Sequence, residues 1–377
     1  MRVILLTGAT GLLGNELLRC YLQAPGDIQI KVLIRGTAEE SQSKFAALAA
    51  DGDASTRARM SERVQLVGGD VQQPRLALSE PDGRALAECV TDIVNSSAAI
   101  DFALPLDAAR AVNYQGTVNL AEFARACPNL RAFAHVSTAH VAGRRSGLIA
   151  EDELEHSAGF VNSYEQSKYE AEQFLRARMG ELPIAVYRST SLIGDSRDGV
   201  VRQFNFFHIA MRFVYHGLIP ALPGIPEGHI DFIPTDYAAR AIQYLIDQSF
   251  HSQTTYHVCA EPARSFTFQE LVNATLEVFR SSLVSKKKKI KPVPIVDPAV
   301  FEKILQQAKD EGHGRVLQAI APLTLFLPHL ALPKVFEASH TQRDLQGSGL
   351  QVPDIRSYYS KVVQYCLRTD WGRRVTS

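Results

Sequence analysis

Two residues four positions apart, Tyr164 and Lys168, could move a proton to or from a carbonyl oxygen. This spacing puts both side chains on one face of a helix. A free phenol has a pKa near ~10, which is too high for efficient proton exchange at neutral pH. An ammonium one helical turn away is expected to lower that pKa, and it could also hydrogen-bond a cofactor ribose. The pair therefore indicates hydride chemistry on a carbonyl, with Tyr164 as the general acid.

A hydroxyl-bearing segment precedes this pair, at the end of an apolar strand that reads His135-Val136-Ser137-Thr138. A hydroxyl at such a strand end could hold a substrate oxygen while charge develops on it. Of the two hydroxyls, we predict that Thr138 has this role. His135 and His140 lie nearby, but the sequence pairs neither with a nucleophile or a metal. We expect both histidines to be structural and predict no metal site.

A glycine loop near the start of the chain has the spacing of a dinucleotide-binding motif. It follows a short apolar strand and leads into a helical pattern. Gly8 and Gly11 would let the backbone approach phosphates, and Gly14 would let the helix pack closely on the strand. Backbone N–H groups at the helix N-terminus could then hold a pyrophosphate. The predicted cofactor contacts in this loop are Thr7, Gly8, Thr10, Gly11, Leu12, Leu13 and Gly14.

The end of the second strand indicates which dinucleotide is bound. A carboxylate at this position would hydrogen-bond the ribose 2′-OH of NAD, whereas Arg35 offers a forked cation to a 2′-phosphate. We therefore predict NADPH, with a surface arginine as the alternative interpretation. Asp70, which closes the third strand, could accept a hydrogen bond from the adenine amino group, or it could cap a turn.

The elements that must position these residues alternate between strands and helices. This rhythm is typical of βαβ units and predicts a Rossmann-type, doubly wound parallel α/β sheet. Helical patterns begin at Asn15 and near Asn113, and the polar residues 50–62 read as a loop or a short exposed helix. The predicted strands are Val3–Leu6, Ile30–Ile34, Val64–Val67, Asp92–Asn95, Ala132–Ser137 and Ile184–Arg188.

The composition of the chain changes after about residue 195. Residues 204–213 are rich in Phe, Met and Ile, and they could be ordinary core or a substrate wall. Residues 316–332 are apolar but interrupted by proline, which suits a buried helical cap, or a surface that contacts an acyl chain or a membrane. We predict an NADP-binding Rossmann core at 1–195, to which residues of about 230–260 also contribute a strand and a helix. Residues 196–377 would form a smaller, mostly helical substrate-binding region.

The composition excludes several function classes. The chain of 377 residues has 40 Lys plus Arg and 40 Asp plus Glu, so its charge gives no reason to expect nucleic acid. Its five cysteines form no CxxC pair, which argues against a disulfide framework or a zinc site. Residues 1–6 read as a strand rather than a signal peptide, and no apolar run approaches the ~20 residues of a membrane span. We expect a soluble, cytoplasmic protein.

The only concentrated charge is the run Lys286–Lys289, with Lys291 just after it. Such a run is typical of a solvated linker or helix end. It could also be a docking patch for an acidic carrier protein or for the phosphates of coenzyme A. We expect charge reversal there to raise the Michaelis constant without altering the rate of chemistry.

Together these residues resemble the extended short-chain dehydrogenases/reductases over residues 1–275. Within that superfamily the chain is similar to thioester reductases and fatty acyl-CoA reductases, although position 77 is Ala where their pattern usually has Gly. The motifs that carry the resemblance are the glycine loop, Gly69-Asp70-Val71-x-x-Pro74-x-Leu76-x-Leu78-Ser79, Asn113-x-x-Gly116-Thr117, Ser137-Thr138 with Gly143, Asn162-x-Tyr164-x-x-Ser167-Lys168-x-x-x-Glu172, Arg188 with Gly194, and Pro234-x-Asp236-Tyr237.

The resemblance implies roles for further residues. It makes Thr138, Tyr164 and Lys168 a catalytic triad. It also implies a complete set of cofactor contacts outside the glycine loop, namely Arg35, Asp70, Val71, Ala98, Asn113, Tyr164, Lys168, Thr190 and Ser191.

The activity implied by the resemblance is NADPH-dependent reduction of an acyl thioester, carried on coenzyme A or a carrier protein, to an aldehyde or further to an alcohol. The chain shows no adenylation or carrier domain, so we expect it to receive its acyl group in trans. One alternative is an NADP-dependent sterol or nucleotide-sugar dehydrogenase or epimerase of the same superfamily. A second alternative is a non-catalytic dinucleotide-binding regulator, which would have little need of Tyr164 and Lys168.

Overall fold

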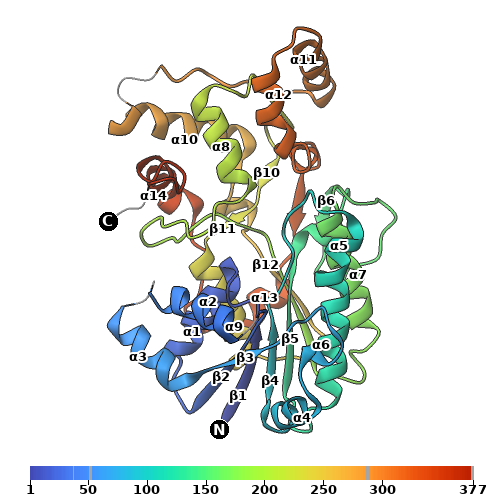
Figure 1. The fold of residues 1–377 in the computed structure, drawn as a ribbon. Coiled ribbons are helices and arrows are strands. Elements are labelled where there is room, and N and C mark those ends of the chain that lie inside the picture. Colours follow the sequence, from blue (N-terminus) through green and yellow to red (C-terminus); the bar gives the residue numbers. More distant parts are fainter. Residues whose placement is uncertain (37, 51–52, 286–288, 375–377) are drawn as a thin grey trace.

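The structure is a computed structural model that describes residues 1–36, 38–50, 53–285 and 289–374 (Figure 1). Its centre is a sheet of seven parallel strands in the order β12-β7-β5-β4-β1-β2-β3. The predicted Rossmann-type sheet is confirmed. The strands are β1 (Arg2–Thr7), β2 (Ile28–Ile34), β3 (Val64–Gly68), β4 (Asp92–Asn95), β5 (Ala132–Thr138), β7 (Ile184–Ser189) and β12 (Thr255–Val258).

Both faces of the sheet are covered by helices, as the alternation of apolar residues in β1 requires. Ile4 and Leu6 pack into one buried cluster with the side chains of α1 and α9. Val3 and Leu5 point the other way, into a cluster with α4, α6 and α7. The helices of this part of the chain are α1 (Leu12–Gln23), α2 (Ala38–Ala50), α3 (Ala54–Arg63), α4 (Glu80–Cys89), α5 (Leu106–Arg110), α6 (Gly116–Arg125), α7 (Ser163–Arg176) and α9 (Thr235–Asp247).

The strand order reverses between β1 and β4, which creates a crevice at the carboxyl ends of these two strands. In doubly wound sheets, ligands bind at this switch point. The glycine loop follows β1, and Ser96 and Ser97 follow β4, so the two loops meet there. The contact is close, because a Cβ atom added to Gly8 would lie 2.3 Å from the Ser96 carbonyl oxygen.

A second buried cluster lies beyond the carboxyl end of the sheet, where Figure 1 shows most of the later helices. Its helices are α8 (Phe206–His216), α10 (Phe268–Ser281), α11 (Pro298–Asp310), α12 (Gly314–Ile320) and α14 (Ile355–Arg368), while α13 (Ser339–Asp344) packs near β12. Four short strand pairs lie outside the central sheet: β6 (Gly147–Ile149) with β15 (Lys334–Phe336), β8 (Ser191–Leu192) with β11 (Phe232–Ile233), β9 (Leu222–Pro223) with β14 (Ile295–Val296), and β10 (His229–Ile230) with β13 (Phe266–Thr267). The first pair joins residues that follow β5 to the C-terminal region.

Three local predictions are refined by the structure. The helix expected to start near Asn113 begins at Leu106, and Asn113 lies inside a π turn, η2 (Ala111–Gln115), which joins α5 to α6. Of the polar residues 50–62, residues 54–62 belong to the helix α3, and residues 51–52 lie outside the described residues. The apolar stretch 316–332 is divided into α12 and two short 3-10 turns, η6 (Ala321–Leu323) and η7 (Leu327–Ala331), which begin around its prolines.

Among the described residues, no helix combines the length and apolar character needed to cross a membrane. Within the lysine run, residues 286–288 lie outside the described residues, so its docking role stays a prediction.

Candidate active site

The proposed catalytic residues lie at the carboxyl end of β5 and in the first two turns of α7. Asn162 caps α7, because its side-chain oxygen accepts a hydrogen bond from the Glu165 amide at 3.1 Å. Tyr164 follows in the first turn, and its phenol is hydrogen-bonded to the Thr138 hydroxyl. Ser137, the other hydroxyl considered, donates instead to the buried Glu172. The structure therefore brings Thr138, rather than Ser137, to Tyr164.

The expected lowering of the Tyr164 pKa is wrong for this structure. Burial of the phenol raises its pKa to about 12, and the hydrogen bond from Thr138 offsets this only in part. Lys168 does not counter the effect of burial, since its ammonium donates to the Val136 carbonyl at 2.8 Å and lies 3.1 Å from His135 Nε2. The Lys168 ammonium is thus held by hydrogen bonds to residues of β5.

Lys168 is almost completely buried, with 1% of its surface exposed. Burial lowers its pKa from 10.5 to about 8, although the carboxylate of Glu172, one turn further along α7, opposes this shift. Lys168 therefore loses its proton at a much lower pH than an ordinary lysine does. Such a shift is typical of functional sites.

A buried chain of hydrogen bonds links Lys168 to the nucleotide loop, and the sequence analysis missed it. Thr7 donates to Asn95 Oδ1 at 2.8 Å, Asn95 Nδ2 lies 3.1 Å from His135 Nδ1, and His135 then meets Lys168. Burial and the neighbouring ammonium lower the pKa of His135, so the imidazole is neutral. Our expectation that His135 has only a structural role was therefore incomplete, because it contacts the proposed catalytic lysine.

The alternation of side chains between the two faces of β5 could have revealed the contact of His135 with Lys168. Residues 135 and 137 share one face of the strand, and residues 168 and 172 share one face of α7. The two faces meet, since His135 contacts Lys168 and Ser137 contacts Glu172. Glu172 in turn holds Arg188 in a fully buried ion pair, with a shortest distance of 2.8 Å.

Asn113 connects the loop after β4 to the catalytic helix. Its side chain accepts a hydrogen bond from the Ala99 amide at 2.8 Å and donates to the Ala99 carbonyl and to Ser167 Oγ. The π turn places this residue inside the helix, where an inserted residue often marks a functional site. Ala98 lies exposed in the same loop, next to Ala99.

The glycine loop forms a cradle that fits a pyrophosphate. Gly8 has a φ of +72°, and a Cβ atom on Gly14 would lie 2.1 Å from the Gly8 carbonyl oxygen, so both positions require glycine. The amide of Gly11 donates to the same carbonyl at 2.9 Å. Within the described part of the chain, no side chain caps the N-terminus of α1, which leaves its first amides available for an anion.

The other loop residues take different positions. Thr10 is exposed and Leu12 is partly exposed at the cradle, whereas Leu13 is buried in the core and Thr7 is engaged with Asn95.

Three further predicted cofactor residues follow the carboxyl ends of β2 and β3. Arg35 is exposed just after β2, and the Lys44 ammonium donates to its carbonyl at 2.6 Å. The Asp70 carboxylate accepts a hydrogen bond from the Gln72 amide at 2.9 Å, as expected if Asp70 caps a turn. The Val71 carbonyl accepts from Asn119, at 2.7 Å.

Thr190 and Ser191 follow β7, which lies in the sheet on the opposite side of β1 from β2 and β3. The Thr190 hydroxyl donates to Asp231 at 2.7 Å, and Ser191 Oγ lies 3.3 Å from His140 Nε2. Burial raises the pKa of Asp231 to about 7, although hydrogen bonds from the Ala260 amide and from Thr190 oppose the shift.

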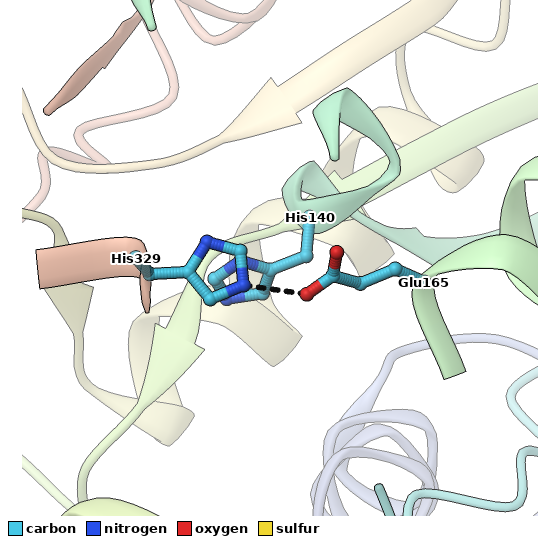
Figure 2. Close-up of side chains that lie close together, drawn as sticks. All are labelled: His140, Glu165 and His329. Carbon is cyan, nitrogen blue, oxygen red and sulfur yellow. Dashed lines mark hydrogen bonds and ion pairs between the residues drawn. The ribbon is translucent and has the colours of Figure 1, made fainter. Parts of the chain in front are cut away.

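A second polar cluster lies beside Tyr164 and contains His140, which we had expected to be structural. Figure 2 shows His329 facing Glu165 with His140 beside them, and one ligand atom of each lies within 4.8 Å of the others. Two imidazoles and a carboxylate can bind zinc. Here, however, Lys334 Nζ lies 3.3 Å from His329 Nδ1 and donates to it, so His329 uses its Nε2 proton to bond Glu165. The cluster thus connects η7 and β15 to the catalytic helix.

Comparison with known proteins agrees with this geometry. Residues 6–242 match the family model described as male sterility protein. The chain belongs to this family. Its members are thioester reductase-like, extended short-chain dehydrogenases/reductases, and they are NAD(P)-dependent oxidoreductases. The resemblance found in the sequence is therefore confirmed, and so is a binding site for NAD(P).

Individual relatives extend the comparison. The chain is 29% identical to a linear gramicidin synthase of Brevibacillus parabrevis over 386 aligned residues, which cover 97% of this chain and 7% of that synthase. The chain thus spans only a small part of that relative's length.

Two solved structures share the fold. The terminal R domain of the myxalamid PKS-NRPS pathway has a TM-score of 0.82 and 24% identity, covering 100% of this chain and 93% of that one. An archaeal thiolation-reductase di-domain has a TM-score of 0.75 and 21% identity, covering 98% and 76%.

Proposed function

We propose that the protein is an NADPH-dependent reductase of acyl thioesters that releases an aldehyde. The observation that carries the proposal is the hydrogen-bonded pair of Thr138 and Tyr164 on the same strand end and helix as the buried Lys168, which hydrogen bonds through His135 and Asn95 connect to Thr7 at the start of the glycine loop. This arrangement provides a dinucleotide site and two hydroxyl donors at one point. The family of the chain is consistent with this assignment.

In the proposed reaction, a bound reduced nicotinamide supplies a hydride to the thioester carbonyl carbon. Thr138 Oγ donates a hydrogen bond to the carbonyl oxygen as negative charge develops there. Tyr164 Oη transfers its proton to that oxygen, which yields a hemithioacetal. The C–S bond then breaks, the hydroxyl proton returns to Tyr164, and the sulfur takes up a proton to leave as a thiol. One hydride and one proton are consumed for each aldehyde formed.

NADPH, rather than NADH, is proposed from the end of β2. Arg35 is exposed there, and Lys44 is tied to its carbonyl, so two cations are available for a 2′-phosphate. We expect Arg35→Asp to weaken NADPH binding more than tenfold while sparing NADH. An equal loss for both cofactors would contradict the assignment.

The thioester is proposed to be presented on a carrier protein. One solved relative is described as joining thiolation and reductase domains in one structure, and another relative is a gramicidin synthase. Acyl-coenzyme A offers the same thioester chemistry. The two sources are distinguished by comparing turnover of the same acyl group on a carrier protein and on coenzyme A.

The test is NADPH oxidation, followed by absorbance, with an acyl-pantetheine thioester, an acyl-coenzyme A, a free aldehyde, and a 3β-hydroxysterol with NADP⁺ in the reverse direction. We expect thioester turnover that falls by ~10²–10⁴-fold in Tyr164→Phe. Tyr169→Phe is the matched control, because that buried phenol on α7 accepts a hydrogen bond from Gln173 on the same helix and has no role in the proposed reaction. Turnover of the sterol alone, or an unchanged rate in Tyr164→Phe, would overturn the proposal. Turnover of the aldehyde would extend the product to an alcohol.

A further inference from the structure

An apolar pocket lies inside the C-terminal region, between α8, α10 and the segment around η7. Its lining side chains are apolar apart from Thr275. The Thr275 hydroxyl is already engaged, because it donates to the Leu271 carbonyl at 2.7 Å. The pocket therefore offers a ligand almost no hydrogen-bonding group. A sugar, a peptide or a nucleotide placed there would leave its own polar groups unpaired, at a large cost in affinity.

A line of aromatic rings leads from Tyr164 to this pocket. The ring of Phe102 lies 5.6 Å from that of Tyr164 and 5.8 Å from that of Phe206, measured between centroids. Phe206 stacks on Phe326, with centroids 3.5 Å apart, and both rings line the pocket. A carbonyl held by Tyr164 therefore lies two ring contacts from the lining of the pocket.

The wall that carries Phe326 is fixed to the catalytic helix. Asn162 Nδ2 donates to the Leu325 carbonyl at 3.1 Å, and His329 bonds Glu165, the neighbour of Tyr164 (Figure 2). These contacts hold the segment from 325 to 330 against the start of α7. The distance between the reacting carbonyl and the pocket is thus set by the protein.

From these observations we propose that the pocket binds the distal part of an unbranched aliphatic acyl chain. This inference rests on the proposed function and names its substrate class. The pocket volume is about 80 Å³, whereas an apolar cavity that accepts benzene measures about 150 Å³. A narrow alkyl chain suits this space better than an aromatic or sterol ring. Because Phe206 and Phe326 line the pocket and Phe102 lies between Phe206 and Tyr164, the carbons next to the thioester would lie along Phe102 and the distal carbons in the pocket.

The test measures kcat/KM for S-acyl pantetheines of increasing chain length, from acetyl to tetradecanoyl, with NADPH. Each methylene that reaches the pocket is expected to raise kcat/KM by about fourfold. Ala210→Trp would fill the pocket from α8 and remove this increase, while leaving acetyl turnover unchanged. Arg212→Trp is the matched control, since it adds the same side chain to α8 at a position that does not line the pocket. Val272→Phe fills the pocket from α10 and serves if Ala210→Trp fails to fold.

A binding measurement separates this inference from the proposed function. S-dodecyl pantetheine is a thioether that cannot be reduced, and its affinity is measured by calorimetry on the wild type, on both pocket variants and on the control Arg212→Trp. We expect binding that is lost in Ala210→Trp and kept in Arg212→Trp. Equal kcat/KM for all chain lengths, or a rate loss in Ala210→Trp that is the same for acetyl and dodecanoyl thioesters, would overturn the pocket assignment and leave the reductase intact. Pocket-dependent binding without turnover of any thioester would support the pocket and refute the proposed reaction.

Discussion

The buried Lys168 gives a specific prediction for the pH dependence of the enzyme. Its pKa is lowered to about 8 by burial, while that of Tyr164 is raised to about 12. Between pH 7 and pH 10 the lysine therefore titrates and the phenol stays protonated. At pH 7 the ammonium exceeds the neutral amine about tenfold, and at pH 9 the ratio is reversed. If the ammonium positions the cofactor ribose, kcat/KM for NADPH should fall about tenfold per pH unit above pH 8.

The assay is initial-rate kinetics from pH 6.5 to pH 10, with NADPH varied at a saturating acyl thioester. The pH profile of kcat/KM for NADPH reports groups of the free enzyme, which is the state described by the structure. Lys334 is the necessary control, because burial lowers its pKa to about 8 as well. In Lys334→Met, kcat/KM for NADPH should still fall above pH 8. Lys168→Met should abolish most of the activity. A kcat/KM for NADPH that stays constant up to pH 10, or a decrease above pH 8 that disappears in Lys334→Met, would refute the reasoning.

The same shift has a consequence for stability. Because the folded pKa of Lys168 lies below 10.5, the unfolded chain binds more protons between pH 8 and pH 10.5, and stability rises with pH over that window. The full shift corresponds to about 3 kcal/mol. In Lys168→Met this gain with pH should disappear, which urea denaturation at pH 7.5 and pH 10 can measure. At neutral pH the stability of the variant should differ little from that of the wild type. The substitution removes the cost of burying the Lys168 ammonium, but it also leaves the Val136 carbonyl without its donor, which costs ~1–3 kcal/mol.

Three further variants test other parts of the structure. Asp231→Asn should stabilise the protein at pH 8 by at most about 4 kcal/mol and much less near pH 4, because the cost of a carboxyl whose folded pKa is about 7 grows as the pH rises from about 4 to 7 and is complete above that. Ala77→Gly should stabilise by about 0.5–1 kcal/mol, because Ala77 has a φ of +57°. Glu172→Gln should destabilise by ~3–5 kcal/mol, because it leaves the fully buried Arg188 without its ion pair. Urea denaturation measures all three.

Each of these variants has an outcome that would contradict its reasoning. A stability change in Asp231→Asn that is the same at pH 4 and pH 8 would show that the carboxyl does not titrate as described. A destabilised Ala77→Gly would mean that the left-handed turn of residues 75–77 carries no strain that glycine relieves. Glu172→Gln within ~1 kcal/mol of wild type would show that Arg188 finds other partners.

The sheet and the shared helix of Tyr164 and Lys168 could be predicted because their signals are local. The glycine loop requires glycine at positions 8 and 14 whatever the rest of the chain does, and the spacing of Tyr164 and Lys168 fixes a shared helix face. The parallel strands were recognisable from short apolar runs that alternate with helices. Arg35, at the end of β2, is likewise a local signal, although the choice between NADPH and NADH is still a prediction.

The contacts that the sequence analysis missed join distant parts of the chain. His135 meets Lys168 across 33 residues, and His329 meets Glu165 across 164 residues. The pocket likewise combines α8 with α10 and the segment around Phe326, so no single stretch of sequence indicates it. The direction of the Tyr164 pKa shift was mispredicted for the same reason, since burial is a property of the folded chain rather than of spacing.

The most direct test of the central claim is to follow a hydride into the product. The protein is incubated with an S-dodecanoyl pantetheine and NADPH that carries deuterium at the transferred position of the nicotinamide, and the aldehyde is trapped and examined by mass spectrometry. We predict dodecanal with one deuterium on its carbonyl carbon, formed at a rate that falls by at least ~10²-fold in Tyr164→Phe and is unchanged in Tyr169→Phe. NADPH oxidation without deuterated aldehyde, or deuterated aldehyde formed equally by Tyr164→Phe, would contradict the account.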